Sequence, residues 1–114
     1  QIPEMTVVGH NTATIRESLL EKAFELGEKF ITASKEHYDP GVIGPFCLQT
    51  CIDKDMDYYI YDVAPRLGGG TNVHVNVGHP YGNATWRKPM SSGRRIAMEI
   101  RKAVEQDRLD EVLT

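Results

Sequence analysis

The chain has 114 residues, 40% of them hydrophobic and 25% charged, and its formal net charge is −3. This length and composition predict a single domain over residues 1–114 with a modest core. The acidic balance argues against nucleic acid as a partner, and the absence of a run of roughly 20 apolar residues argues against a membrane partner, so we expect a cytoplasmic location.

The first residues, from Gln1 to Glu4, lack an initiator methionine and are typical of the middle of a polypeptide. We therefore expect a fragment of a longer protein.

An amphipathic pattern begins at Thr14 and continues to about His37. Apolar residues recur at helical spacing on two adjacent stripes. One carries Ile15, Leu19, Ala23, Leu26 and Phe30, and the stripe beside it carries Leu20, Phe24, Gly27 and Ile31. Thr14 and Glu17 have the spacing of a capping box, which predicts that the helix starts at Thr14. Asp39-Pro40-Gly41 predicts its end, because proline lacks a backbone donor and glycine permits the turn.

Two runs rich in β-branched and aromatic residues follow, at 42–52 and 58–63, and they predict a β-hairpin. If residues 54–57 form the loop, Gln49 lies opposite Asp62. One face of the sheet then carries a Gln–Asp pair. The same register places Cys51 opposite Ile60.

Three consecutive glycines in the segment 67–72 predict a loop whose backbone can approach another group closely. Val73, Val75 and Val77 alternate with polar residues, which predicts a short third strand. An irregular segment should follow it.

Ser91 or Ser92 can cap a second helix that runs to about Gln106, and a last helical turn should cover residues 109–113. We expect an α+β fold, with an antiparallel sheet of three or more strands and helices packed mainly on one face. The inward side of the second helix should carry Ile96, Ile100, Ala103 and Val104.

The most informative stretch joins Asp62, at the end of a strand, to Arg66 and the glycine loop. A carboxylate can hold Mg²⁺, an arginine can neutralise phosphate oxygens, and glycines allow backbone N–H groups to reach those oxygens. This set suits phosphoryl transfer. On spacing alone, a surface ion pair between Asp62 and Arg66 explains the residues equally well.

Several separated segments carry a resemblance to a known family. They are IRESLLEKAFE at 15–25, GPFCLQ at 44–49, APRLGGGTN at 64–72, HPYG at 79–82 and PMSSGRRIAMEIRKAV at 89–104. In this order they resemble the C-terminal region of the archaeal formate-dependent AICAR ligases (FAICAR synthetases) of purine biosynthesis, which belong to the ATP-grasp superfamily. The resemblance spans nearly the whole chain, and several motifs in order are more specific than one.

The resemblance implies that residues 1–114 form the C-terminal part of an ATP-grasp ligase. In such a ligase, formate takes the γ-phosphate of ATP, and the amino group of AICAR attacks the resulting formyl phosphate to give FAICAR. ATP and Mg²⁺ or Mn²⁺ are the implied cofactors, and formate and AICAR the implied small-molecule substrates. The remainder of the enzyme is the implied partner, we expect a homo-oligomer, and the fragment alone should be inactive.

The motif positions also imply individual roles. Gln49 and Asp62 would be the metal ligands, and the hairpin register independently brings this pair together. Arg66 would be catalytic and would contact phosphate. The implied nucleotide- and cofactor-binding residues are Arg66, Gly69, Gly70, Thr71 and Asn72.

Two positions depart from the family pattern, which has glutamate in place of Asp62 and a small residue in place of Pro65. Aspartate still ligates Mg²⁺, but its side chain is shorter by roughly 1.5 Å, so the ion or the strand must shift. One alternative is therefore a paralogous ATP-grasp ligase that acts on another carboxylate. Another is a non-catalytic oligomerisation domain in which the tyrosine-rich sheet and the helices mediate assembly.

Overall fold

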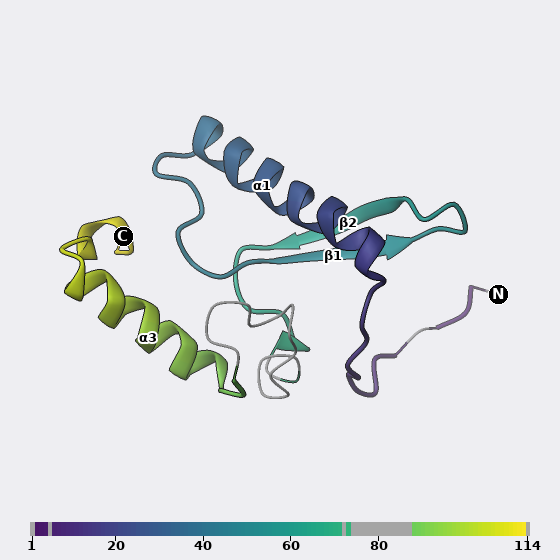
Figure 1. Cartoon of the computed structure of the whole chain (residues 1–114). Coiled ribbons are helices and arrows are strands. Elements are labelled where there is room, and N and C mark those ends of the chain that lie inside the picture. The colour runs from purple at the N-terminus through teal and green to yellow at the C-terminus, as the bar shows by residue number, and fades with distance from the viewer. Residues whose placement is uncertain (1, 5, 72, 74–87, 114) are drawn as a thin grey trace.

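The computed structural model is a small α+β domain and describes residues 2–4, 6–71, 73 and 88–113 (Figure 1). A two-stranded antiparallel sheet and two long helices make up its described part. No helix among these residues is long and apolar enough to cross a membrane. The elements in chain order are the 3₁₀ turn η1 (Glu17–Leu19), α1 (Leu20–His37), β1 (Cys47–Ile52), β2 (Tyr58–Ala64), α3 (Ser92–Glu105) and the 3₁₀ turn η2 (Leu109–Glu111).

The first helix starts later than its sequence pattern predicts. Its first turn, η1, begins at Glu17, and the residue before it, Arg16, makes no side-chain capping bond. Arg16, and not Thr14, therefore directly precedes the first helical turn, and Glu17 lies in that turn, where a carboxylate interacts favourably with the helix dipole. The predicted end is confirmed: α1 stops at His37, and Gly41 adopts a left-handed φ of 89°.

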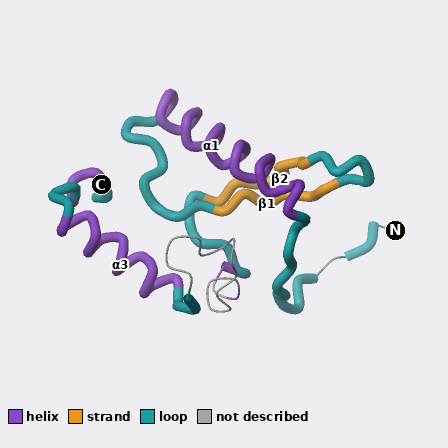
Figure 2. The backbone as a smooth tube through the Cα atoms, viewed as in Figure 1, coloured by secondary structure: helices purple, strands orange, loops and turns teal. Residues whose placement is uncertain are grey.

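Helix α1 lies along one face of the hairpin, as the ribbon and the tube both show (Figures 1 and 2). The rings of Phe30 and Phe46 are 4.9 Å apart between centroids. The hydroxyl of Tyr58 donates to the carbonyl oxygen of Leu19 at 3.1 Å. Leu19 is buried as the helical pattern predicts, whereas Phe24, on the neighbouring apolar stripe, is 57% exposed.

The strands β1 and β2 confirm the predicted pairing of Gln49 with Asp62. Nearer the turn the prediction is wrong by one residue, because Cys51 lies opposite Tyr59 and not opposite Ile60. The extra residue on β2 is Tyr61, at a β-bulge that restores the predicted register at the open end of the hairpin.

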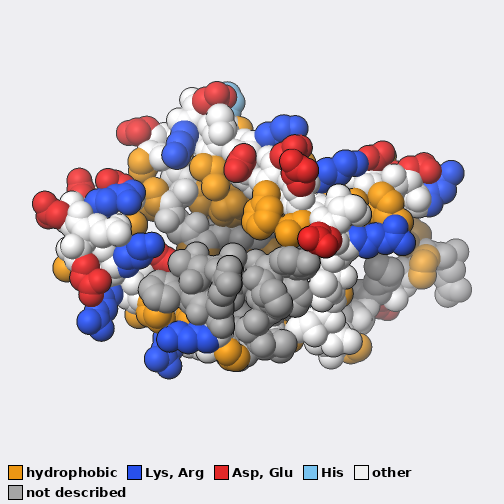
Figure 3. All heavy atoms as spheres, viewed as in Figure 1, with side chains coloured by type: hydrophobic (Ala, Val, Ile, Leu, Met, Phe, Trp, Pro, Cys, Tyr) orange, Lys and Arg blue, Asp and Glu red, His pale blue; other side chains and the backbone are white. Residues whose placement is uncertain are grey.

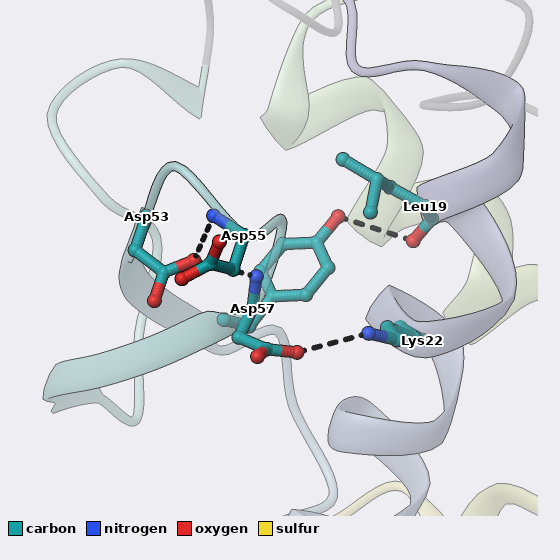
Figure 4. Close-up of polar contacts among 6 residues, drawn as sticks. Leu19, Lys22, Asp53, Asp55 and Asp57 are labelled. Carbon is teal, nitrogen blue, oxygen red and sulfur yellow. Dashed lines mark hydrogen bonds and ion pairs between the residues drawn. The ribbon is translucent and has the colours of Figure 1, made fainter.

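The turn of the hairpin explains this shift. It contains residues 53–57, since Ile52 already pairs with Tyr58. The Asp53 carboxylate accepts the backbone N–H groups of Asp55 and Asp57 at 2.9 and 3.0 Å, as Figure 4 shows. With Asp53 used in this way, the turn is one residue longer than predicted.

Helix α3 lies beyond the open end of the hairpin and not over the strands (Figure 1). Ser91 is its cap, because its Oγ accepts the backbone N–H of Arg94 at 3.2 Å. Ala103 is buried as predicted, but Val104 is 56% exposed, which contradicts the expected inward position. The turn η2 confirms the last predicted helical segment.

The predicted third strand is not found at its first residue, since Val73 is helical. Residues 74–77 and most of the expected irregular segment lie outside the described residues. The sheet therefore has two strands within the described part of the chain, fewer than predicted.

Several large apolar side chains remain exposed on this domain. Tyr59 and Tyr61 on β2 are 55% and 68% exposed. Figure 3 shows hydrophobic side chains between acidic and basic ones on the face it presents. Exposed apolar surface of this extent is typical of a face that packs against another part of a protein.

Candidate functional site

The centre of the candidate site is the pair formed by Gln49 and Asp62. The Gln49 Nε2 donates to the Asp62 Oδ2 at 2.9 Å. Gln49 is half-buried and Asp62 is exposed. Ile52 pairs with Tyr58, whose hydroxyl reaches Leu19 beside α1, so these two side chains lie on the α1 face of the hairpin. Side chains alternate between the two faces along a strand, and Gln49 is three residues from Ile52. The Gln49–Asp62 pair therefore projects from the opposite face.

The chemistry of this pair fits a hard divalent cation. An amide oxygen and a carboxylate oxygen are the ligands that Mg²⁺ accepts, and Mg²⁺ usually takes one or two protein ligands together with phosphate oxygens and water. No group of three or more His, Cys, Asp or Glu side chains able to hold a metal occurs among the described residues. Gln49 and Asp62 carry the oxygen ligands of a cation that is shared with a phosphorylated ligand.

The glycine loop after β2 folds back over the same face of the hairpin. A Cβ atom at Gly68 would lie 2.9 Å from the Cys47 Sγ. Cys47 and Gln49 are two residues apart on β1, so both side chains leave one face of the strand. The backbone then turns, since the Thr71 N–H donates to the Gly68 carbonyl at 3.1 Å. The structure thus brings the glycine loop and the Gln49–Asp62 pair to one side of the sheet.

Arg66 lies at the start of this loop and is exposed. Its Nη1 donates to the Leu67 carbonyl at 2.9 Å, while Asp62 is bonded to Gln49. Asp62 and Arg66 therefore do not form the ion pair that was the alternative interpretation of these two residues. The guanidinium remains close to the loop whose amide groups it would assist.

The remaining predicted loop residues are placed only in part. Gly69 and Gly70 lie in a turn, as predicted, whereas Thr71 is already helical, and Asn72 lies outside the described residues.

His10 is a neighbour of this loop that the sequence patterns did not single out. A Cβ atom at Gly69 would lie 2.9 Å from the His10 Nε2, and one at Gly70 would lie 3.4 Å from its Nδ1. The imidazole therefore packs directly on the backbone of two of the three glycines. His10 belongs to no motif, and its contact with a loop far along the chain carries no local signal.

A hollow of about 470 Å³ adjoins the glycine loop on the side of α3. Its walls are mainly apolar and come from the loop before β1, the residues after β2 and the inner side of α3. Arg95 and Glu99 form an ion pair of 2.9 Å in the wall. The volume falls in the range of small-molecule sites, roughly 300–1,000 Å³. Ile43, Pro45, Leu67, Thr71, Ile96 and Ile100 are among the lining residues.

Comparison with known proteins adds independent information. Residues 1–114 match the family described as a domain of unknown function (DUF1297). Relatives from Saccharolobus solfataricus, Sulfurisphaera tokodaii and Methanobrevibacter smithii are 46%, 44% and 40% identical over 112 residues. Each is named a 5-formaminoimidazole-4-carboxamide-1-(beta)-D-ribofuranosyl 5'-monophosphate synthetase. The matches cover 98% of this chain but 33%, 33% and 31% of those relatives, so the chain spans about a third of their length.

Proposed function

The chain belongs to the DUF1297 family, and from this premise we propose that it is the part of an ATP-dependent AICAR-formylating ligase that supplies metal and phosphate ligands. The relatives support the product, because their shared name is that of a synthetase of the formylated nucleotide. The observation that carries the role of this chain is the Gln49–Asp62 pair, which lies beside the glycine loop on one face of the hairpin.

The proposed reaction has two balanced steps. A formate oxygen attacks the γ-phosphorus of ATP, the bond to the β-phosphate oxygen breaks, and ADP leaves. The amino group of AICAR then attacks the carbonyl carbon of formyl phosphate, phosphate leaves with the bonding electron pair, and the amine loses a proton. FAICAR, ADP and phosphate are the products.

The residues of this chain act mainly by positioning and by electrostatics. Gln49 and Asp62 would hold Mg²⁺ or Mn²⁺, which supplies charge neutralisation at phosphate oxygens when it is bound. The backbone amides of Gly69 and Gly70 and the guanidinium of Arg66 would donate to phosphate oxygens. Thr71 follows the glycines and lines the hollow. It would contact the phosphorylated substrate at the point where the uncharged ring of that substrate enters the hollow.

Assembly of the ATP-grasp site would require the rest of the enzyme, because Asp62 and Arg66 are exposed on this domain. Tyr59 and Tyr61 on β2 are also exposed. We assign that surface to the remainder of the same ligase, acting as a homo-oligomer in the cytoplasm.

The test is ADP release by the full-length protein supplied with ATP, Mg²⁺, formate and AICAR, with each component omitted in turn. We expect ADP formation to require both formate and AICAR, and a formylated nucleotide to appear in equal amount. ADP formation with a different carboxylate, and not with formate, would identify that carboxylate as the substrate. Absence of turnover with every carboxylate, in a correctly assembled protein, would leave only the role of an assembly domain and overturn the ligase proposal.

A further inference from the structure

The contact between His10 and the glycine loop has no role in the function proposed above. His10 lies in the segment before η1, yet its ring touches the loop that follows β2. A Cβ atom at Gly69 would approach its Nε2 to 2.9 Å, a distance at which one of the two groups must move. A side chain at residue 69 would therefore require either the exposed imidazole or the loop to shift.

We propose that His10 is a positioning residue of the phosphate site, and this inference rests on the function proposed above. Its imidazole packs against Gly69 and Gly70 and restricts the conformations of a backbone that is otherwise highly mobile, because glycine has the largest conformational freedom of any residue. A loop held in one conformation presents its amide groups to phosphate oxygens without losing that freedom on binding. The ligand it serves is a phosphate group, carried either by ATP or by AICAR.

The experiment measures kcat and KM of the full-length enzyme separately for ATP and for AICAR. His10→Ala should raise KM for one of the two about fivefold, with kcat within about twofold, since a positioning contact that acts on binding alone changes KM. The substrate whose KM rises identifies the phosphate that the loop holds. His10→Phe, which keeps a planar ring, should retain most of the affinity. Asn11→Ala is the matched control, because Asn11 is the next residue and its side chain accepts the backbone N–H of Thr12.

A double-mutant cycle separates this role from a general structural one. Gly69→Ala should raise the same KM in the wild-type background, because the new Cβ displaces either the loop or the imidazole. In the His10→Ala background the same change should have a much smaller effect, because the ring that it meets is gone.

Independent effects of the two changes, or unchanged KM values for both substrates in His10→Ala, would overturn the role of His10 while turnover remains. The ligase proposal fails in a different way, by the absence of wild-type turnover. In that case the four proteins of the cycle, which are the wild type, His10→Ala, Gly69→Ala and the double variant, are compared by the rise in melting temperature that inorganic phosphate produces. A His10-dependent stabilisation would still support the loop contact, and its absence would overturn it.

Discussion

The side-chain amide of Gln49 donates to the carboxylate of Asp62 at 2.9 Å, immediately beside the bulge at Tyr61. Bulges often occur next to active sites, where the local change of twist re-aims a side chain. Here the bulge separates two stretches of the hairpin. The stretch toward the turn is fixed by the Asp53 network, and the stretch at the open end carries the proposed metal ligands and leads into the glycine loop.

The first prediction concerns Asp62. Asp62→Ala should lower the rate of ADP formation by about 100-fold, because loss of the carboxylate weakens binding of the cation and so reduces the charge neutralisation that the cation provides. The rate of Asp62→Glu should stay within about tenfold of the wild-type rate, because glutamate retains a carboxylate ligand for the cation on a longer side chain. The measurement is ADP release as a function of Mg²⁺ concentration.

Asp110→Ala is the matched control, because Asp110 is an exposed carboxylate in η2, remote in sequence from the hairpin and the glycine loop. Full activity of Asp62→Ala at low Mg²⁺ would remove Asp62 from the metal site.

The open end of the hairpin was predictable from sequence, and the turn was not. Alternation and apolar runs fix which strands pair, and they place Gln49 opposite Asp62. The length of the turn depends on the Asp53 side chain, which binds two backbone N–H groups in competition with strand pairing. The bulge at Tyr61 compensates for that extra residue. The predicted pairing of Gln49 with Asp62 was therefore right even though the register near the turn was wrong.

Contacts between distant segments were also beyond the sequence patterns. Helical periodicity identified the apolar stripe of the helix that contains Leu19, but it could not show that Phe24 stays exposed. Two neighbouring apolar stripes look alike in sequence, and their burial differs only through the segments that pack against them. The packing of His10 on Gly69 is of the same kind. Only the folded chain brings these segments together.

The second prediction concerns pH and Asp53. The pKa of Asp53 lies below its ordinary value, chiefly because its carboxylate accepts the backbone N–H of Asp57, with a further contribution from Asp55. A group whose pKa is lower in the folded state stabilises that state above its unfolded pKa, and this contribution is lost as pH falls through the folded pKa. The protection of the amide hydrogens of residues 55 and 57, measured against the intrinsic exchange rate at each pH, should therefore fall as the solution is acidified below about pH 4.

Asp53→Asn should remove this acid transition, because an amide oxygen accepts hydrogen bonds at every pH but does not titrate in this range. Asp53→Ala should lose the protection at neutral pH as well. An acid transition that persists in Asp53→Asn would assign it to another carboxylate.

The third prediction concerns the hydrogen bond between α1 and the hairpin. Tyr58→Phe should destabilise the protein by about 1 kcal/mol, because the Leu19 carbonyl loses the hydroxyl that donates to it at 3.1 Å. Thermal melting measures the loss. Tyr61→Phe is the control, since Tyr61 is 68% exposed and should melt like the wild type.

The neighbouring ion pair should matter less. Lys22 Nζ lies 3.1 Å from the Asp57 Oδ1, and the two side chains are 52% and 59% exposed. Lys22→Ala should therefore cost well under about 1 kcal/mol, and the difference should shrink as salt is added. A loss equal to that of Tyr58→Phe, unchanged in high salt, would contradict this ranking of the two contacts.

The last prediction concerns Ser34, a buried polar residue in the last turns of α1. Its Oγ donates to the Ile31 carbonyl at 2.8 Å and accepts the backbone N–H of Val42 at 3.1 Å. Ser34→Ala leaves that N–H without its acceptor, which costs about 1–2 kcal/mol, and the better helix propensity of alanine offsets only about 0.5 kcal/mol. We expect a net loss of roughly 1 kcal/mol in thermal melting.

Thr32→Ala is the control for Ser34, because Thr32 is exposed on the same helix and gains the same propensity. Val42 leads into Ile43 and Pro45, which line the hollow, and then into β1 with Gln49. Loss of the Ser34 bond should therefore also raise KM for the phosphorylated substrate modestly, because the wall of the hollow is less well held. A Ser34→Ala protein as stable as Thr32→Ala, with an unchanged KM, would show that the segment before β1 is held by its apolar contacts alone.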